Sequence, residues 1–447
     1  MEKNVIEKVM ERAKHDDVKF VNLWFTDFFG AIKSTTIPVE KLNESFERGI
    51  WFDGSSIEGF ARIHESDMYL KPDPSTYAVL PWRPRQKAVA RFVCDVYRPD
   101  GKPFEGDPRF VLKKVLAEAK EMGYVFNVGP ELEFFLFKVN GEPTLRPVTH
   151  DTAGYFDFAP RDMASDVRRN IVFALEEMGI EVEMSHHEVA PGQHEIDFKY
   201  GEALKTADNT ITLKTATKAI AHSMELHASF MPKPIFGQNG SGMHTHQSLF
   251  TTAGRNAFYD AGDKYKLSGV AKHFIAGQLK HIKAMSAVLD PTVNSYKRLV
   301  PGYEAPVYIC WASINRSALI RVPQYSPGRE QSVRAELRCP DPSCNPYLAF
   351  AAMLKAGLDG IKNKMPLPAA VEENVYGFSD EKLQELKIDV LPSSLRDSIE
   401  AFKKSSLMKE MMGAETFEKY INVKMKEWDM FRISVTDWEK HQYFDVL

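Results

Sequence analysis

The sequence predicts an α+β protein in which a small N-terminal domain precedes a large one. Its 447 residues exceed the ~100–200 residues of a typical domain. Segments with the strand period of about 2 residues and segments with the helix period of about 3.6 both occur along the chain. Glycine, proline and aspartate are concentrated at 98–106, and this turn-rich stretch predicts a boundary between domains 1–104 and 105–447.

The first domain is expected to be mostly β. Residues 1–14 are the exception, because Val5, Val9 and Ala13 lie on a single helical stripe. Apolar and polar residues alternate in three strand-like runs, at 18–25, 31–37 and 88–97.

The second domain is expected to alternate helices with strands. Asp107 and Pro108 are typical of a helix N-terminus, and Gly123 is typical of its end. Further helices are expected at 164–178, 204–229 and 266–288, after Asn345-Pro346 and in the tail from about 378, and strands at 125–128 and 131–137. The tail ends in aromatic residues, which favours insertion into a partner subunit over exposure on a monomer.

Composition excludes several classes of protein. Apolar residues make up 44% of the chain and charged residues 26%, which is typical of a globular protein rather than a disordered one. The net charge of −4 gives no footprint for nucleic acid or an anionic membrane. No apolar stretch approaches the ~20 residues that span a bilayer, and no secretion signal is recognised. We therefore expect a cytoplasmic protein with neither nucleic acid nor membrane as a partner.

The first chemical motif is a pair of glutamates on a predicted strand. Residues two apart on a strand share a face, so Glu131 and Glu133 point the same way. Like charges so placed repel one another unless a cation lies between them. A solvated strand face is the ordinary alternative, and the apolar residues that flank the pair argue against it.

The second motif is a predicted hairpin at 183–195. Pro191-Gly192 returns the chain towards itself, so Glu188 and Glu195 can meet across the hairpin. A surface hairpin with charged edges is the alternative. A third motif, at 239–248, weakens that alternative, because its glycines allow close approach to a ligand and are followed by a second polar strand face. That face carries His244, His246 and Ser248.

The fourth motif alternates charges of opposite sign. Arg334, Glu336 and Arg338 share one strand face, which suits either a salt-bridge ladder or a metal-binding carboxylate between two anion-binding arginines. Together the motifs supply five glutamates and one histidine, a set that favours Mg²⁺ or Mn²⁺ over zinc. With the arginines at 298–338, this set fits a nucleoside triphosphate and phosphoryl transfer. The chain contains neither a P-loop motif nor a Rossmann fingerprint.

With these motifs the chain resembles glutamine synthetase of class I, the prokaryotic type, in its shorter branch that is not adenylylated. The resemblance spans essentially the whole chain and is carried by 53–57, 129–135, 187–195, 239–246, 294–306 and 334–338. It implies an N-terminal β-grasp domain and a catalytic domain on an antiparallel sheet flanked by helices. It also implies two stacked hexameric rings with active sites between subunits, and synthesis of glutamine from glutamate, ammonia and ATP through γ-glutamyl phosphate.

The resemblance also implies roles for single residues. Metal ligands are expected at Glu133, Glu188 and Glu195 for one ion and at Glu131, His244 and Glu336 for the ion that bridges ATP. The ATP site is expected at Glu183, Tyr200, His246, Ser248, Arg316, Arg321 and Arg334. The glutamate site is expected at Asn239, Gly240, Arg298, Glu304, Arg316 and Arg338. The expected catalytic residues are Asp53, which deprotonates ammonium from the neighbouring subunit, Glu304 in a closing flap and Arg316 beside the transferred phosphoryl group.

Three alternatives and one question of regulation stay open at this point. A ligase acting on a bulkier amine would keep the same chemistry, a zinc hydrolase would use His244 and His246, and a non-catalytic sensor would keep only the fold. The seven-residue spacing of Glu188 and Glu195 matches the shorter branch, so we expect no adenylylation at Tyr376. Regulation by glutamine, by 2-oxoglutarate or by a small protein partner is expected in its place.

Overall fold

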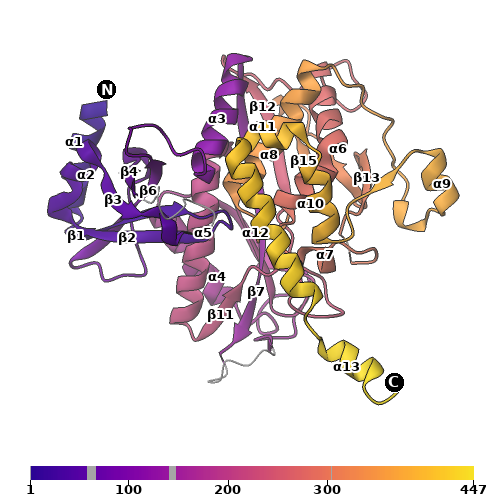
Figure 1. Ribbon diagram of the computed structural model, residues 1–447, viewed down its shortest axis with the longest axis horizontal. Coiled ribbons are helices and arrows are strands. Elements are labelled where there is room, and N and C mark those ends of the chain that lie inside the picture. Colours follow the sequence, from indigo (N-terminus) through magenta and orange to yellow (C-terminus); the bar gives the residue numbers. More distant parts are fainter. Residues whose placement is uncertain (1, 58–66, 140–146, 304) are drawn as a thin grey trace.

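The computed structural model describes residues 2–57, 67–139, 147–303 and 305–447 of the chain. Two β-sheets organise it, a six-stranded sheet near the N-terminus and a ten-stranded sheet in the larger remainder (Figure 1). This arrangement confirms the predicted α+β class. Among the described residues, no helix combines the length and the apolar character needed to cross a bilayer.

The small sheet has the strand order β2-β1-β6-β4-β3, with β5 paired to β6. Its strands are β1 (Val18–Thr26), β2 (Ile32–Pro38), β3 (Ile50–Asp53), β4 (Asp67–Pro72), β5 (Ala78–Val79) and β6 (Ala88–Tyr97). The central strands β1 and β6 run parallel, and the remaining pairs are antiparallel. Helices α1 (Glu2–His15) and α2 (Leu42–Arg48) contribute Val9, Ala13 and Phe46 to the apolar core beneath this sheet.

The large sheet has the order β16-β13-β14-β15-β12-β7-β9-β8, and β10 and β11 also pair with β7. Its strands are β7 (Tyr124–Lys138), β8 (Val182–His187), β9 (Gln193–Phe198), β10 (Gly201–Glu202), β11 (Leu226–Ser229), β12 (Thr245–Thr251), β13 (Tyr308–Ala312), β14 (Ala318–Arg321), β15 (Ala335–Leu337) and β16 (Asp389–Val390). Every pair is antiparallel except β13 with β14.

Strand β7 is longer than the sequence predicts. It runs unbroken through Gly129 and Pro130, where two strands were expected, because β12 pairs with it across this point and places His246 opposite Gly129. The alternation along β7 separates two faces: Leu132 and Phe134 belong to the apolar core, whereas Glu131 and Glu133 point to the other side.

Most helices of the large domain contribute buried apolar residues to its core. The helices of this domain are α3 (Pro108–Glu121), α4 (Ser165–Glu177), α5 (Ala203–Ser223), α6 (Gly269–Leu289), α7 (Ser295–Arg298), α8 (Pro346–Lys362), α9 (Asp380–Glu385), α10 (Leu395–Lys403), α11 (Ser406–Met412), α12 (Ala414–Arg432) and α13 (Asp437–Tyr443). Helices α6 and α8 touch backbone to backbone at Gly277 and Gly360, where a Cβ on either residue would overlap the other helix. Helix α5 stops at Ser223, before the end expected near 229, because the chain turns at Glu225 with a positive φ of 59° and enters β11.

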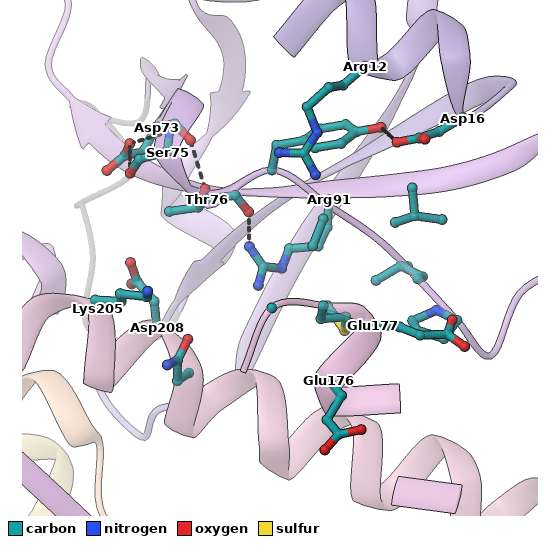
Figure 2. Close-up of a pocket in the computed structure, with 18 of the residues that line it drawn as sticks. Arg12, Asp16, Asp73, Ser75, Thr76, Arg91, Glu176, Glu177, Lys205 and Asp208 are labelled. Carbon is teal, nitrogen blue, oxygen red and sulfur yellow. Dashed lines mark hydrogen bonds between the residues drawn. The ribbon is translucent and has the colours of Figure 1, made fainter. Parts of the chain in front are cut away.

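A buried arginine joins the two parts of the chain. Arg109 on α3 contacts Asp73 and Asp95 of the small domain at 2.7 and 2.6 Å and Asp208 of α5 at 2.9 Å. Beside it lies a cavity of about 970 Å³. Figure 2 shows this interdomain cavity, with Arg12 on one side and Asp208 on the opposite side.

Candidate active site

A second cavity, of about 520 Å³, lies over the polar face of β7. Fourteen of the residues that the sequence singles out line it, and they come from segments more than 200 residues apart. They are Glu131, Glu133, Glu188, Glu195, Asn239, Gly240, His244, His246, Arg298, Arg316, Arg321, Arg334, Glu336 and Arg338. The sheet brings them together, because the antiparallel neighbours of β7 place their own polar faces on the same side.

One part of this cavity is acidic and has little compensating charge. Glu133 on β7 lies opposite Glu195 on β9, and Glu188 follows β8 in the turn that joins β8 to β9. Ligand atoms of His186, Glu188 and Glu195 lie within 4.8 Å of one another. We refer to Glu133, His186, Glu188 and Glu195 as the Glu188 cluster.

The raised pKa values of Glu133 and Glu195 indicate that the protein does little to neutralise the charge of these two carboxyl groups. Burial, and then the charge of Glu188, raise the pKa of Glu133 to about 8. Burial, and then the charges of Asp197 and Glu133, raise the pKa of Glu195 well above its usual range. Several buried carboxyl groups around one cavity are stable in their ionised form when a cation lies among them, so this cluster fits a divalent metal ion.

The other part of the cavity carries a second acidic group. Glu131, His244 and Glu336, here called the Glu336 cluster, also place ligand atoms within 4.8 Å of one another. Arg321 and Arg338 donate to the two carboxylate oxygens of Glu336 at 3.0 and 3.1 Å. Burial raises the pKa of Glu336, but the neighbouring His246, His244 and Arg338 outweigh burial and hold the pKa below its usual value. This carboxylate is therefore ionised and ready to bind a cation.

His244, which immediately precedes β12, and His246 on β12 make different contacts. Arg334 Nε donates to Nδ1 of His246 at 3.1 Å, so the ring proton of neutral His246 is on Nε2, which lies 2.7 Å from Oε1 of Glu131. Both ring nitrogens of His246 are thus occupied within the protein. His244 keeps Nδ1 towards Glu131 and Glu336, at 3.3 and 3.8 Å. Of the two histidines, His244 is therefore the one that belongs to a group able to hold a metal ion, which argues against a zinc hydrolase, in which both histidines bind the metal.

The donor set of the cavity over β7 suits particular metal ions. Five glutamates and one histidine are hard ligands of the kind that Mg²⁺ and Mn²⁺ accept, and the four cysteines are buried elsewhere. By contrast, three aspartates of the interdomain cavity are engaged: Asp73 and Asp208 pair with Arg109, and Asp16 accepts the hydroxyl of Tyr77 at 2.7 Å (Figure 2). Among the described residues, two of the three groups that could hold a metal ion lie in the cavity over β7, and the third, His150, Asp151 and His194, is buried outside it.

Four expected site residues do not line the cavity, and a fifth lies outside the described residues. Asp53 lies in the small domain at the end of the edge strand β3, where its Oδ1 accepts from the backbone N–H of Ser55 at 2.9 Å. Glu183 is exposed on β8, and Tyr200 packs over Gly129, next to the strand position of His246. The other two are Ser248, buried on β12, and Glu304, which lies outside the described residues.

Among the cavity residues that the sequence did not single out, two form hydrogen bonds with the glutamates of the Glu188 cluster. His186 Nε2 lies 2.8 Å from Oε1 of Glu188, and the spacing His186-x-Glu188 on a strand already placed both side chains on one face. Gln193 donates to Oε2 of Glu133 at 2.8 Å. It follows Pro191-Gly192 and is uncharged, so no sequence signal set it apart from an ordinary turn residue.

Comparisons with known proteins agree with this geometry. The family model described as the catalytic domain of glutamine synthetase matches residues 105–443, and the model described as its β-grasp domain matches residues 17–99. The chain belongs to the glutamine synthetase family. The expected β-grasp domain and catalytic domain of glutamine synthetase are thereby confirmed.

Individual members of the glutamine synthetase family match over nearly the whole chain. Glutamine synthetase of Methanosarcina mazei is 55% identical over 99% of this chain and 98% of its own length. Those of Clostridium saccharobutylicum and Thermotoga maritima are 54% and 52% identical, over 100% and 98% of this chain and 100% and 99% of their own lengths. A solved structure titled "GmaS/ADP complex-Conformation 1" superposes with a TM-score of 0.89 at 31% identity, covering 98% of this chain and 99% of that one.

Proposed function

We propose that this chain ligates ammonia to the γ-carboxylate of L-glutamate in an ATP-dependent reaction that gives L-glutamine, ADP and phosphate through γ-glutamyl phosphate. The observation that carries the proposal is the cavity over β7, in which two acidic clusters lie together with five arginines. A carboxylate that attacks a γ-phosphate brings two anions together, so the site has to supply positive charge on both sides. The family membership and the full-length identity to glutamine synthetases support the same reaction.

Two divalent ions, Mg²⁺ or Mn²⁺, complete this site. Glu133, Glu188 and Glu195 would hold one ion, and Glu131, His244 and Glu336 the other. When bound, the ions supply Lewis acidity and charge neutralisation to the phosphate oxygens. His246, fixed by Arg334, orients Glu131, and Arg321 orients Glu336.

The remaining side chains divide between the two substrates. The nucleotide contacts assigned here are Glu183, Tyr200, His246, Ser248, Arg316, Arg321 and Arg334, and the glutamate contacts are Asn239, Gly240, Arg298, Glu304, Arg316 and Arg338. In the structure Arg298 is 4% exposed and donates to the carbonyl of Arg338 at 3.1 Å, so the protein holds the two arginines as a unit at one wall of the cavity. Two guanidinium groups held in this way suit a dicarboxylate such as glutamate.

Asp53 acts on a neighbouring subunit in this proposal. The exposed edge strand that carries it lies away from the cavity of its own chain, as an arrangement with active sites between subunits requires. The proposed assembly is two stacked hexameric rings. Helix α13, which carries the exposed Trp438 and is followed by the exposed Phe444, extends away from the body of the chain (Figure 1), so a partner subunit would cover these side chains. Glu304 closes over bound glutamate as part of the flap. The division at 104/105 and a cytoplasmic location stay predictions.

The experiment that tests the proposed function is phosphate release with different amines. With ATP, Mg²⁺ and glutamate, ammonium should support phosphate release together with glutamine formation. Methylammonium and polyamines should not, because Asp53 and its loop suit a small cation. Release that needs a larger amine would assign the chain to another γ-glutamyl ligase. Absence of any glutamate- and amine-dependent release in folded protein would contradict the ligase altogether.

A further inference from the structure

Gln193 at the start of β9 is a buried polar residue to which no role has been assigned. Its side chain is 1% exposed and lies at the wall of the cavity over β7. Its Nε2 lies 2.8 Å from Oε2 of Glu133 and 3.1 Å from the carbonyl oxygen of Gly240. Its Oε1 accepts from the backbone N–H of Ala190 at 3.1 Å. Every strong hydrogen-bonding position of the amide is therefore in use.

The protein fixes the orientation of this amide. The N–H of Ala190 is always a donor, so the atom of Gln193 that faces it has to be the oxygen. The two protons of the NH₂ group then point to Glu133 and Gly240, which are both acceptors. A flipped amide would place its oxygen against a carboxylate and a carbonyl, and would leave all three groups without partners.

The two acceptors belong to different parts of the proposed site. Glu133 is in the Glu188 cluster, and Gly240 is in the loop 239–242 assigned to glutamate. The same loop touches Glu133 a second time, because the backbone N–H of Glu133 donates to the carbonyl of Gly242 at 3.3 Å. A Cβ on Gly242 would lie 3.2 Å from Oε1 of Glu133 and 2.6 Å from Nη2 of Arg298. The loop 239–242 is thus packed against both Glu133 and Arg298.

The loop has little freedom to move independently of Gln193. A Cβ on Gly240 would overlap the carbonyl oxygen of Pro232, and Ser241 donates its backbone N–H to that same oxygen at 2.8 Å. Gln193 holds the opposite side of the loop through the carbonyl of Gly240. A shift of Glu133 on binding a metal ion is therefore transmitted to the backbone that faces glutamate.

We propose that Gln193 is a positioning residue that couples the two ligands, so that a divalent ion at the Glu188 cluster raises the affinity of the loop 239–242 for glutamate. This inference rests on the proposed function. By linkage, glutamate raises the affinity for the ion by the same factor. Gln193 does not itself bind either ligand in this account, and it acts through Glu133 and Gly240.

The test compares Gln193→Met with wild-type protein in direct binding measurements. Methionine has a similar volume but cannot donate to Glu133 or Gly240. Mn²⁺ affinity is measured by electron paramagnetic resonance of free Mn²⁺, and glutamate affinity by calorimetry with and without saturating Mn²⁺. We expect the dissociation constant for Mn²⁺ to rise about tenfold, as for other residues that orient metal ligands. We expect the ratio of the two glutamate affinities to fall roughly fivefold or more.

Gln278→Met is the matched control. Gln278 on α6 is also fully buried and hydrogen-bonded, to Gln247 and the carbonyl of Met353, but it does not contact a carboxylate of the cavity. This variant loses the same kind of buried amide and should keep both the Mn²⁺ affinity and the ratio of glutamate affinities. An equal loss of the ratio in both variants would show general destabilisation, and would contradict a specific role for Gln193.

A second variant keeps the test decisive where the methionine variant does not fold. Gln193→Asn retains the amide but is shorter by one methylene, so we expect a smaller loss of the ratio. Wild-type affinity and an unchanged ratio in whichever of the two variants folds would overturn the inference. If the ratio is unchanged while wild-type protein releases phosphate normally, the result contradicts the role of Gln193 and leaves the proposed function in place. Failure of wild-type phosphate release would instead contradict the proposed function.

Discussion

Glu133 on β7 and Glu195 on β9 are directly opposed on neighbouring antiparallel strands, and both residues are buried. Like charges in such positions destabilise a sheet. Apolar residues at the same places would avoid that cost, so the arrangement has its physical explanation in a bound cation.

Metal binding at this pair should depend on pH. The raised pKa of Glu133, about 8, keeps a proton on the metal-free protein near neutral pH, and the ion has to displace it. Because the pKa of Glu195 is raised as well, we expect release of at least one proton, and Mn²⁺ affinity should increase by about tenfold or more per pH unit between pH 6 and 7.5. Calorimetry in two buffers of different ionisation enthalpy measures that proton. A Mn²⁺ affinity that is independent of pH would contradict the claim that the metal-free cluster holds a proton that the ion displaces.

The raised pKa of Glu133 also predicts how the stability of the metal-free protein changes with pH. The folded protein holds a proton on Glu133 that the unfolded chain releases above its ordinary pKa of 4.5. Between about pH 4.5 and 8 the contribution of this group to the free energy of unfolding therefore falls as pH rises. Saturating Mn²⁺ should abolish that part of the pH dependence, as measured by denaturant unfolding.

Arg334 should matter for the nucleotide through His246. Arg334→Gln removes the donor that fixes the ring proton of His246 on Nε2, where it donates to Glu131. We expect the KM for ATP to rise about tenfold and the KM for glutamate to change much less. Arg255→Gln, a change at an exposed arginine beyond the end of β12, is the control. A larger effect on glutamate than on ATP would contradict this assignment.

Replacement of the buried Arg109 should lower the free energy of unfolding strongly. Arg109→Met leaves Asp73, Asp95 and Asp208 without their buried counter-ion, and we expect the free energy of unfolding to fall by about 3–5 kcal/mol. Arg85→Met breaks the exposed pair with Glu177 and should cost less than about 1 kcal/mol. Equal losses in guanidinium unfolding would show that the three aspartates do not depend on Arg109.

Tyr376 should not be a site of nucleotidyl attachment. Its hydroxyl donates to the carbonyl of Ala305 at 2.6 Å and is only partly accessible. Attachment would require that hydrogen bond to break, in the loop next to the proposed flap. Intact-mass measurement of native protein should show no adduct on Tyr376, and a nucleotide mass at this residue would refute the prediction.

The C-terminal tail should determine the size of the assembly. Phe444 and Leu447 are 84% and 98% exposed on the isolated chain, an arrangement that is unfavourable unless a partner covers them. Removing residues after Trp438 should give single rings or smaller species in light scattering. The truncated chain should fold, because none of the removed residues is buried. Unchanged mass would count against a role for the tail.

The sequence predicted much of the site because alternation on strands is a local property. The shared face of Glu131 and Glu133 followed from their spacing, and the approach of Glu188 to Glu195 followed from Pro191-Gly192. Neither inference needed to know which strands pair.

What the sequence did not reveal depends on pairing between distant segments. The register of β12 against β7 and β15 places His246 beside Gly129 and Glu336, and nothing near His246 in the sequence specifies this. The hydrogen bonds of Gln193 likewise need three separate segments in place. The single strand through Pro130 escaped prediction because its neighbours, and not its own residues, keep the chain extended there.

The most direct test of the central claim is anomalous diffraction from crystals grown with Mn²⁺ and ADP. We expect two strong anomalous difference peaks in each cavity over β7. One should lie among Glu133, Glu188 and Glu195, and the other among Glu131, His244 and Glu336. A cavity without manganese, or with manganese bound at the interdomain cavity instead, would contradict it.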